Sequence, residues 1–229
     1  MSKNIPITGI IGQKGGGGKT TIAINLAVSA AKQSLATVII DLDQQTNAAK
    51  WHTRRKENNV AVVATSIARL GVTIETAIKN GAEFIVIDSP GHNDSAATET
   101  VRASDFVLVP VEPQMFHFDT MPAMRNIVRL GGDKPTWIMV NKLHPRASAM
   151  ADRLKRIIFE TYSMPVCPVH MSRYDIYATS ADTGSTPLEK DPGSRAAEEI
   201  KQLYKFISQQ VHKLRTSHVQ ETGKLTASA

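Results

Sequence analysis

A glycine-rich segment near the start of the chain has the residue types needed to bind phosphate. Residues 14–20 read Lys-Gly-Gly-Gly-Gly-Lys-Thr, and a second threonine follows. Glycines carry no Cβ, so their backbone N–H groups can approach an anion closely and surround it. The Lys19 ammonium can reach the β- and γ-phosphates of a nucleotide, and the Thr20 hydroxyl can bind Mg²⁺. The predicted phosphate ligands are Gly15, Gly16, Gly17, Gly18, Lys19, Thr20 and Thr21.

The segments on either side support this interpretation. Residues 5–11 form an apolar, β-branched run typical of a buried strand, and residues 21–32 carry apolar side chains at helical spacing. Strand, glycine-rich turn and helix are the context of a phosphate-binding loop, because the start of the helix adds its positive end to the anion site. The loop departs from the pattern G-x-x-x-x-G-K-[ST], since Gln13 stands where the first glycine is expected and Lys14 is an additional lysine.

Acidic residues end two of the predicted strands. The apolar run 37–41 ends in Asp41, with Asp43 two residues later, and the run 84–88 ends in Asp88. The carboxyl ends of parallel strands meet at one edge of a sheet, which is where ligands bind. A single acid at a strand end is often only solvated, but two beside a phosphate loop favour a metal site. We assign Mg²⁺ binding to Asp88, and the position of Asp43 would let it orient a water near the γ-phosphate.

Apolar strands and helices alternate along the whole chain. Continuous apolar strands separated by helices predict an α/β fold, with a mostly parallel twisted sheet flanked by helices on both faces. We expect a single-domain P-loop NTPase over residues 1–215 and a flexible tail over 216–229. The further strands are expected at 60–64, 106–111, 136–140 and, shorter, 166–169, and the further helices at 43–58, 72–79, 96–103, 119–130, 149–162, 175–182 and 194–214.

Composition restricts the class of protein but does not identify its binding partner. Hydrophobic residues make up 41% of the chain and charged residues 21%, as in soluble globular proteins. The formal net charge of +6 favours contact with polyanions such as nucleic acid or anionic lipid. Cys167 is the only cysteine, which excludes an intrachain disulfide and a cysteine metal cluster. With no signal peptide and no apolar run near 18 residues, we expect a cytoplasmic protein.

Two motifs give the chain a specific resemblance to a known family. The loop K-G-G-x-G-K-T resembles the deviant Walker A motif of the ParA/MinD family of ATPases. Family members commonly carry D-x-D-P-Q-x-N after the second strand, and this chain has Asp41, Asp43, Gln45 and Asn47 in place, with Gln44 where proline is usual. The resemblance extends from about residue 5 to residue 214, is most specific in the first hundred residues, and is closest to small plasmid-partition members.

The resemblance implies roles for individual residues. It makes ATP and Mg²⁺ the cofactors, Asp43 the residue that orients water, and Asp41 a support of the metal site with Thr20 and Asp88. Asn141 matches the position at which the family reads adenine, and the segment that begins at Pro168 resembles the family's C-terminal third, so both are assigned to the nucleotide. An asparagine at a strand end can equally be a turn residue.

Lys14 is the family's signature lysine, and it implies a dimer. In the family this lysine crosses to the nucleotide of the other subunit, so we expect a homodimer that forms with ATP and in which Lys14, Lys19 and Asp43 act in hydrolysis. The resemblance also implies a nucleoid-associated ATPase that binds DNA nonspecifically and is stimulated by a ParB-like centromere-binding protein. The basic residues expected to contact DNA backbone phosphates are Arg195, Lys201, Lys205, Lys213 and Arg215.

Other functions remain open at this stage. The same basic residues could simply be solvated helix faces. The ATPase could position a protein cargo instead of DNA, or it could be a MinD-like regulator at a membrane, although the moderate apolar face of the last helix favours core packing over a membrane anchor. A metabolic P-loop enzyme is the third alternative, and Lys14 argues against it.

Overall fold

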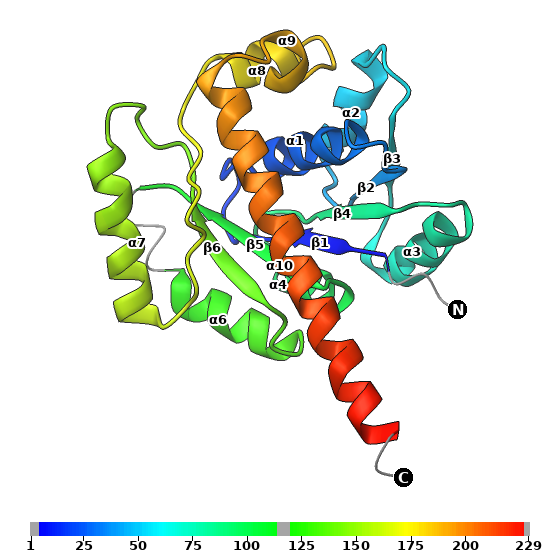
Figure 1. Ribbon diagram of the computed structural model, residues 1–229. Coiled ribbons are helices and arrows are strands. Elements are labelled where there is room, and N and C mark those ends of the chain that lie inside the picture. The colour runs from blue at the N-terminus through cyan, green and yellow to red at the C-terminus, as the bar shows by residue number, and fades with distance from the viewer. Residues whose placement is uncertain (1–4, 114–119, 227–229) are drawn as a thin grey trace.

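Six parallel strands form one sheet at the centre of the molecule (Figure 1). The computed structural model describes residues 5–113 and 120–226, with the side chains of Ser148 and residues 215–226 not described. The strand order is β3-β2-β4-β1-β5-β6, and every pairing is parallel. The strands are β1 (Ile7–Ile10), β2 (Thr37–Asp41), β3 (Val60–Ala64), β4 (Phe84–Asp88), β5 (Phe106–Val111) and β6 (Thr136–Val140). The predicted fold class is confirmed.

Helices cover both faces of the sheet, because the strands are apolar on both sides. One face carries α1, α2, α9 and α10, and the other carries α3, α4, α6 and α7. The helices are α1 (Lys19–Ala31), α2 (Asn47–Arg54), η1 (Ile67–Arg69), α3 (Leu70–Lys79), α4 (Asp94–Ala103), α6 (Met121–Leu130), α7 (Ser148–Tyr162), α8 (Ile176–Ala181), α9 (Pro187–Lys190) and α10 (Arg195–Thr226).

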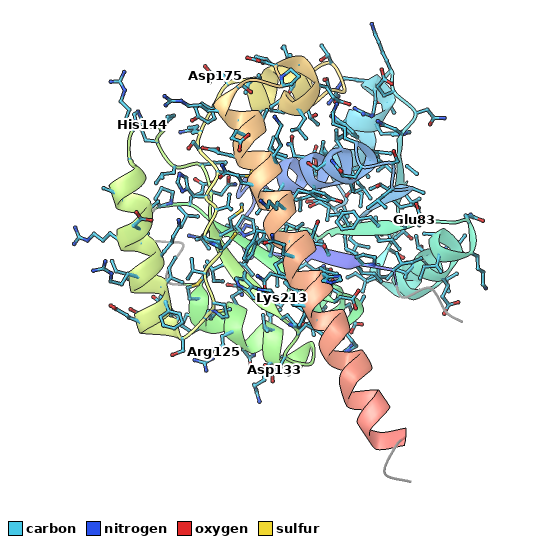
Figure 2. All side chains as sticks on the ribbon, in the orientation of Figure 1. Glu83, Arg125, Asp133, His144, Asp175 and Lys213 are labelled. Carbon is cyan, nitrogen blue, oxygen red and sulfur yellow. The ribbon has the colours of Figure 1, made fainter. Side chains whose placement is uncertain are left out.

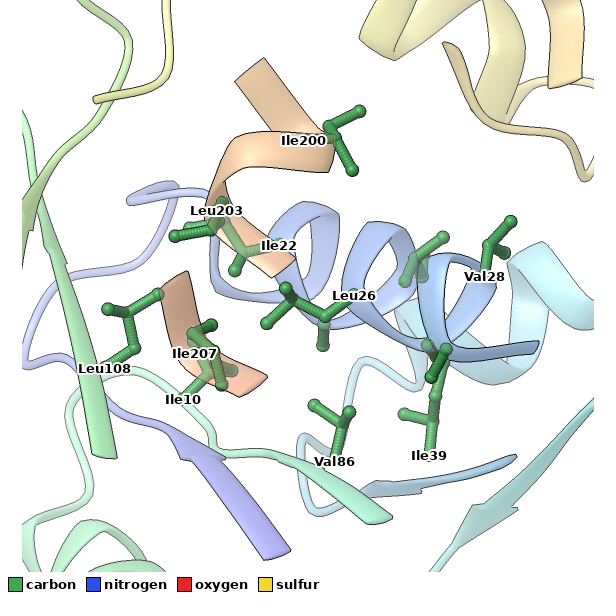
Figure 3. Close-up of a cluster of buried hydrophobic side chains, with 14 of the residues drawn as sticks. Ile10, Ile22, Leu26, Val28, Ile39, Val86, Leu108, Ile200, Leu203 and Ile207 are labelled. Carbon is green, nitrogen blue, oxygen red and sulfur yellow. The ribbon is translucent and has the colours of Figure 1, made fainter. Parts of the chain in front are cut away.

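The helix that follows the phosphate loop is the most deeply buried one. Ile22 and Leu26 of α1 are fully buried between the sheet and α10, where they meet Ile10 of β1 and Ile207 of α10 (Figure 3). A fully buried leucine or isoleucine stabilises the fold by about 1.5–3 kcal/mol relative to an exposed one. This packing fixes the helix, and therefore fixes the loop at its N-terminus.

Helix ends differ from expectation more than strand ends do. Helix α2 covers Asn47–Arg54 instead of residues 43–58, and α9 was not expected. Residues 166–169 form a single bridge, between Val166 and Ile138, instead of a strand. Helix α10 continues to Thr226, through residues that we expected to form a tail, and the domain boundary at residue 215 stays a prediction. The expected helix start at residue 119 lies outside the described residues.

Candidate nucleotide-binding site

The glycine-rich segment links the end of β1 to the start of α1, as the sequence predicted. Gly18 precedes the helix with φ +87°, a left-handed conformation that favours glycine. A Cβ at Gly18 would also lie only 2.3 Å from the side-chain nitrogen of Asn141. The loop therefore requires glycine here for two reasons, its backbone conformation and its contact with the strand end at Asn141.

Lys19 is a buried lysine that faces carboxylates. Its side chain lies in the site with only 7% of the residue exposed, and its ammonium donates a hydrogen bond to the Lys14 carbonyl at 3.1 Å. Burial lowers the pKa of Lys19, while the negative charges of Asp88 and Asp43 oppose that shift. A lysine held this way presents a positive charge to the loop, where phosphate oxygens would supply further hydrogen-bond acceptors.

Asp88 is the most unusual group in the site. It ends β4, is fully buried, and neither carboxylate oxygen accepts a hydrogen bond of standard geometry from the residues that the structure describes. Desolvation raises the pKa of Asp88 to about 7, helped by Asp41 and Asp43 and opposed by the Thr20 hydroxyl and Lys19. An orphaned buried carboxylate beside a threonine hydroxyl fits Mg²⁺, which prefers oxygen ligands and is often shared with substrate phosphates. Two of the three residues assigned to the metal site, Thr20 and Asp88, are therefore brought together.

Asp41 is adjacent to Asp88 in the sheet, but its carboxylate accepts hydrogen bonds from backbone N–H groups. The two residues are register partners on β2 and β4, and both are fully buried. The Asp41 carboxylate accepts hydrogen bonds from the backbone N–H groups of Asp43 at 3.0 Å, Ala48 at 3.1 Å and Ala49 at 3.3 Å. Asp41 thus caps α2 and shapes the turn after β2. Its assigned role in the metal site stays a proposal, and its observed contacts are structural.

Asp43 lies at the entrance to this turn and is partly exposed. Its carboxylate accepts a hydrogen bond from the backbone N–H of Gln45 at 2.9 Å, and its charge acts on both Lys19 and Asp88. The second carboxylate oxygen has no hydrogen bond within the described part of the chain that would hold it in place. This arrangement leaves Asp43 able to accept a hydrogen bond from a water.

The end of β6 contributes residues whose contacts the sequence did not predict. The Asn141 amide donates a hydrogen bond to the Gly17 carbonyl at 2.8 Å. The Lys142 ammonium donates to the Gly16 carbonyl and to Glu112 at 2.8 Å. Both contacts tie the outer rim of the loop to β6, so Asn141 positions the loop in this structure. Its predicted contact with adenine stays a prediction.

The segment after β4 packs directly against the loop. A Cβ at Gly91 would lie 2.9 Å from the Gly15 nitrogen, and the Gly15 N–H donates to the imidazole of His92 at 3.4 Å. The backbone N–H of His92 in turn donates to the Gln13 carbonyl at 3.1 Å. These contacts were not predicted from the sequence, because neither Gly91 nor His92 belongs to a motif. The signal that could have found them is the proline-glycine pair at positions 90–91, directly after the strand, since such pairs mark tight loops.

Several predicted residues belong to later segments of the chain than the loop. The Pro168 carbonyl accepts a hydrogen bond from the Lys155 ammonium at 2.6 Å, and no hydrogen bond in the described part of the chain joins Pro168 to the loop. Arg195, Lys201, Lys205 and Lys213 lie on α10, and Figure 2 labels Lys213. The side chain of Arg215 lies outside the described residues. Contacts of these residues with nucleotide or DNA stay predictions.

Comparison with known proteins identifies the family. Residues 8–214 match the model of the CobQ/CobB/MinD/ParA nucleotide binding domain. The chain is also 26% identical over 200 residues to the maintenance of carboxysome distribution protein A of Gloeobacter kilaueensis, and this alignment covers 84% of the chain and 88% of the relative.

Solved structures show the same fold at lower identity. A putative plasmid partition protein from Borrelia burgdorferi, bound to AMPPNP, superposes with a TM-score of 0.71 at 15% identity, covering 90% of this chain and 100% of that one. The septum site-determining protein MinD from Pyrococcus horikoshii, complexed with Mg-ADP, gives a TM-score of 0.71 at 17% identity, covering 87% and 94%. With the loop, the buried lysine and the buried carboxylate in one place, the chain belongs to the CobQ/CobB/MinD/ParA nucleotide binding domain family.

Proposed function

We propose that the protein is a partition ATPase that dimerises with Mg-ATP, binds DNA nonspecifically and hydrolyses ATP when a partner protein stimulates it. The observation that carries the proposal is the cluster of Lys19, Asp43 and Asp88 around a loop that also contains Lys14. Partition as the purpose is supported by the name of the Borrelia burgdorferi neighbour, a putative plasmid partition protein.

The residues of the site divide the work of hydrolysis. The loop amides and Lys19 bind the phosphates, and Thr20 and Asp88 would hold Mg²⁺, which neutralises charge on the phosphate oxygens when bound. Asp43 accepts a hydrogen bond from the attacking water and orients it in line with the γ-phosphate. Lys19 stabilises the negative charge that develops on the phosphoryl oxygens in the transition state.

Lys14 is proposed to act across a dimer. Lys19 already supplies a charge within the loop, so a second lysine at the loop's start has a different role. The family resemblance implies that Lys14 contacts the nucleotide of the other subunit. The loop lies at the carboxyl edge of the sheet, where two subunits can face each other with nucleotide between them. Because nucleotide would fill much of such an interface, dimerisation would depend on ATP.

DNA binding is assigned to the basic residues of α10. Lysine and arginine side chains that neutralise phosphates release condensed counterions, so affinity should fall steeply with salt and should not depend on sequence. The test is DNA binding with Mg-ATP at several salt concentrations, for the wild type and for the double variant Arg195→Glu, Lys213→Glu. The variant should bind all duplexes more weakly and with a shallower salt dependence. Preference for one operator, or a flat salt response, would contradict the proposal.

A protein cargo is the second candidate, and one observation favours it. The relative that aligns over 88% of its own length is named for carboxysome distribution. Such a protein could use the same ATP cycle with a different partner.

The third candidate is a regulator at a membrane. Among the described residues, no helix combines the length and the apolar character that a transmembrane span requires. The MinD-like alternative is tested by pelleting with anionic liposomes, where wild type that stays in the supernatant with ATP counts against it.

A further inference from the structure

A large cavity lies between the C-terminal half of α1 and α10, away from the nucleotide loop. It is open to solvent and has a volume of about 740 Å³, within the range of about 300–1,000 Å³ that small-molecule sites occupy. Ser29 and Lys32 line it from the α1 side, and Lys201 and Lys205 line it from α10. None of these side chains has a role in the ATP site.

The walls of this cavity carry positive charge only. Three lysines line it, and among the described lining residues none is an aspartate or glutamate. The Lys201 ammonium donates to the Pro192 carbonyl at 2.9 Å, which fixes it at the rim and leaves two further protons to donate. All three lysines are exposed, and their charge, without a lining carboxylate, would attract an anion.

The floor of the cavity is apolar. Leu188 is 3% exposed, and the half-buried ring of Tyr204 packs edge-on against Phe84 with centroids 6.0 Å apart. Burial raises the pKa of Tyr204. An inorganic anion would leave this floor uncovered, and the backbone of a DNA duplex offers no apolar group to cover it.

We propose that the α1–α10 cavity binds an organic anion, a carboxylate or phosphate attached to an apolar or aromatic body. The anionic group contacts the lysines and the apolar body covers Leu188 and Tyr204. A second cavity of about 450 Å³ adjoins the first, and both are lined by Lys32, Leu188 and Pro192. An elongated ligand can therefore extend from one into the other. The cavity shares Lys201 and Lys205 with the proposed DNA contacts, but its binding of an organic anion does not require the partition function.

Two fluorescent probes with the same ring system test the proposal. 8-Anilinonaphthalene-1-sulfonate carries an anionic group, and N-phenyl-1-naphthylamine lacks it. Titrations are done with saturating Mg-ADP, so that the nucleotide site is blocked. They are repeated with Lys19→Ala, which should fail to bind nucleotide but should leave the cavity unaltered. We expect the affinity for the sulfonate to be at least about tenfold higher than that for the neutral probe, because charge-assisted contacts form only with the anion.

Variants locate the binding. Lys201→Glu with Lys205→Glu should weaken sulfonate binding by about tenfold or more, and Tyr204→Ala should weaken both probes while leaving DNA binding unchanged. Lys213→Glu, further along α10, is the matched control and should bind the sulfonate as the wild type does. Displacement by dodecanoate would identify a carboxylate ligand, and displacement by phenyl phosphate a phosphate ligand. Equal binding of the two probes, binding unaffected by the lysine variants, or displacement by neither anion would overturn the proposal.

Discussion

Asp88 allows a quantitative prediction about stability. In the nucleotide-free protein its pKa is raised from 3.8 to about 7, chiefly by burial. The folded state therefore holds a proton that the unfolded state releases between these two values, and stability falls as pH rises through that window. One pKa unit corresponds to about 1.4 kcal/mol, so the full penalty above pH 7 is about 4 kcal/mol. Asp88→Asn removes the ionisable group and should remove the penalty.

The assay is urea unfolding without Mg²⁺ or nucleotide, followed by the fluorescence of Trp51 and Trp137 from pH 4 to pH 8. Asp88→Asn should match the wild type near pH 4 and exceed its stability by about 4 kcal/mol at pH 8, a midpoint shift of more than about 1 M urea. The exposed Glu160→Gln is the control and should show no such divergence. A stability difference that stays constant over this pH range would refute the reasoning.

Three substitutions test other parts of the site. Lys19→Ala should abolish ATP binding or turnover in a protein with wild-type circular dichroism, and normal turnover would contradict the loop assignment. Asp43→Ala should still bind ATP but hydrolyse it roughly 10²–10⁴-fold more slowly in single-turnover experiments, whereas loss of ATP binding would make Asp43 a metal or structural residue. Gly18→Ala, which combines a left-handed φ with a Cβ 2.3 Å from Asn141, should lower nucleotide affinity in calorimetry, and unchanged affinity would show that the loop adapts.

The strands were predictable from sequence because their signal is local. The ranges 37–41, 84–88 and 136–140 agree with β2, β4 and β6, since each is a continuous apolar run that ends at a polar residue or just before one. The positions of Lys19 and Asp88 followed from the parallel sheet, which brings the carboxyl ends of adjacent strands together.

The missed features depend on contacts between distant residues. Helix α2 begins at Asn47, where the carboxylate of Asp41 accepts the N–H groups of the first turn, and no periodicity in the sequence marks that start. The contact of Asn141 with Gly17 spans 124 positions along the chain. The α1–α10 cavity likewise joins Lys32 to Lys201, which no local pattern relates.

Lys14 distinguishes an ATPase that works as a nucleotide-bridged dimer from one that works as a monomer. Lys14→Ala keeps the loop amides and Lys19, so it should still bind ATP. The measurement is multi-angle light scattering with Mg-ATP and with Mg-ADP, with the exposed Lys79→Ala of α3 as a control for loss of a lysine outside the loop. We expect a dimer for the wild type and the control with ATP only, and a monomer for Lys14→Ala in both nucleotides. A Lys14→Ala protein that dimerises normally with ATP would contradict it.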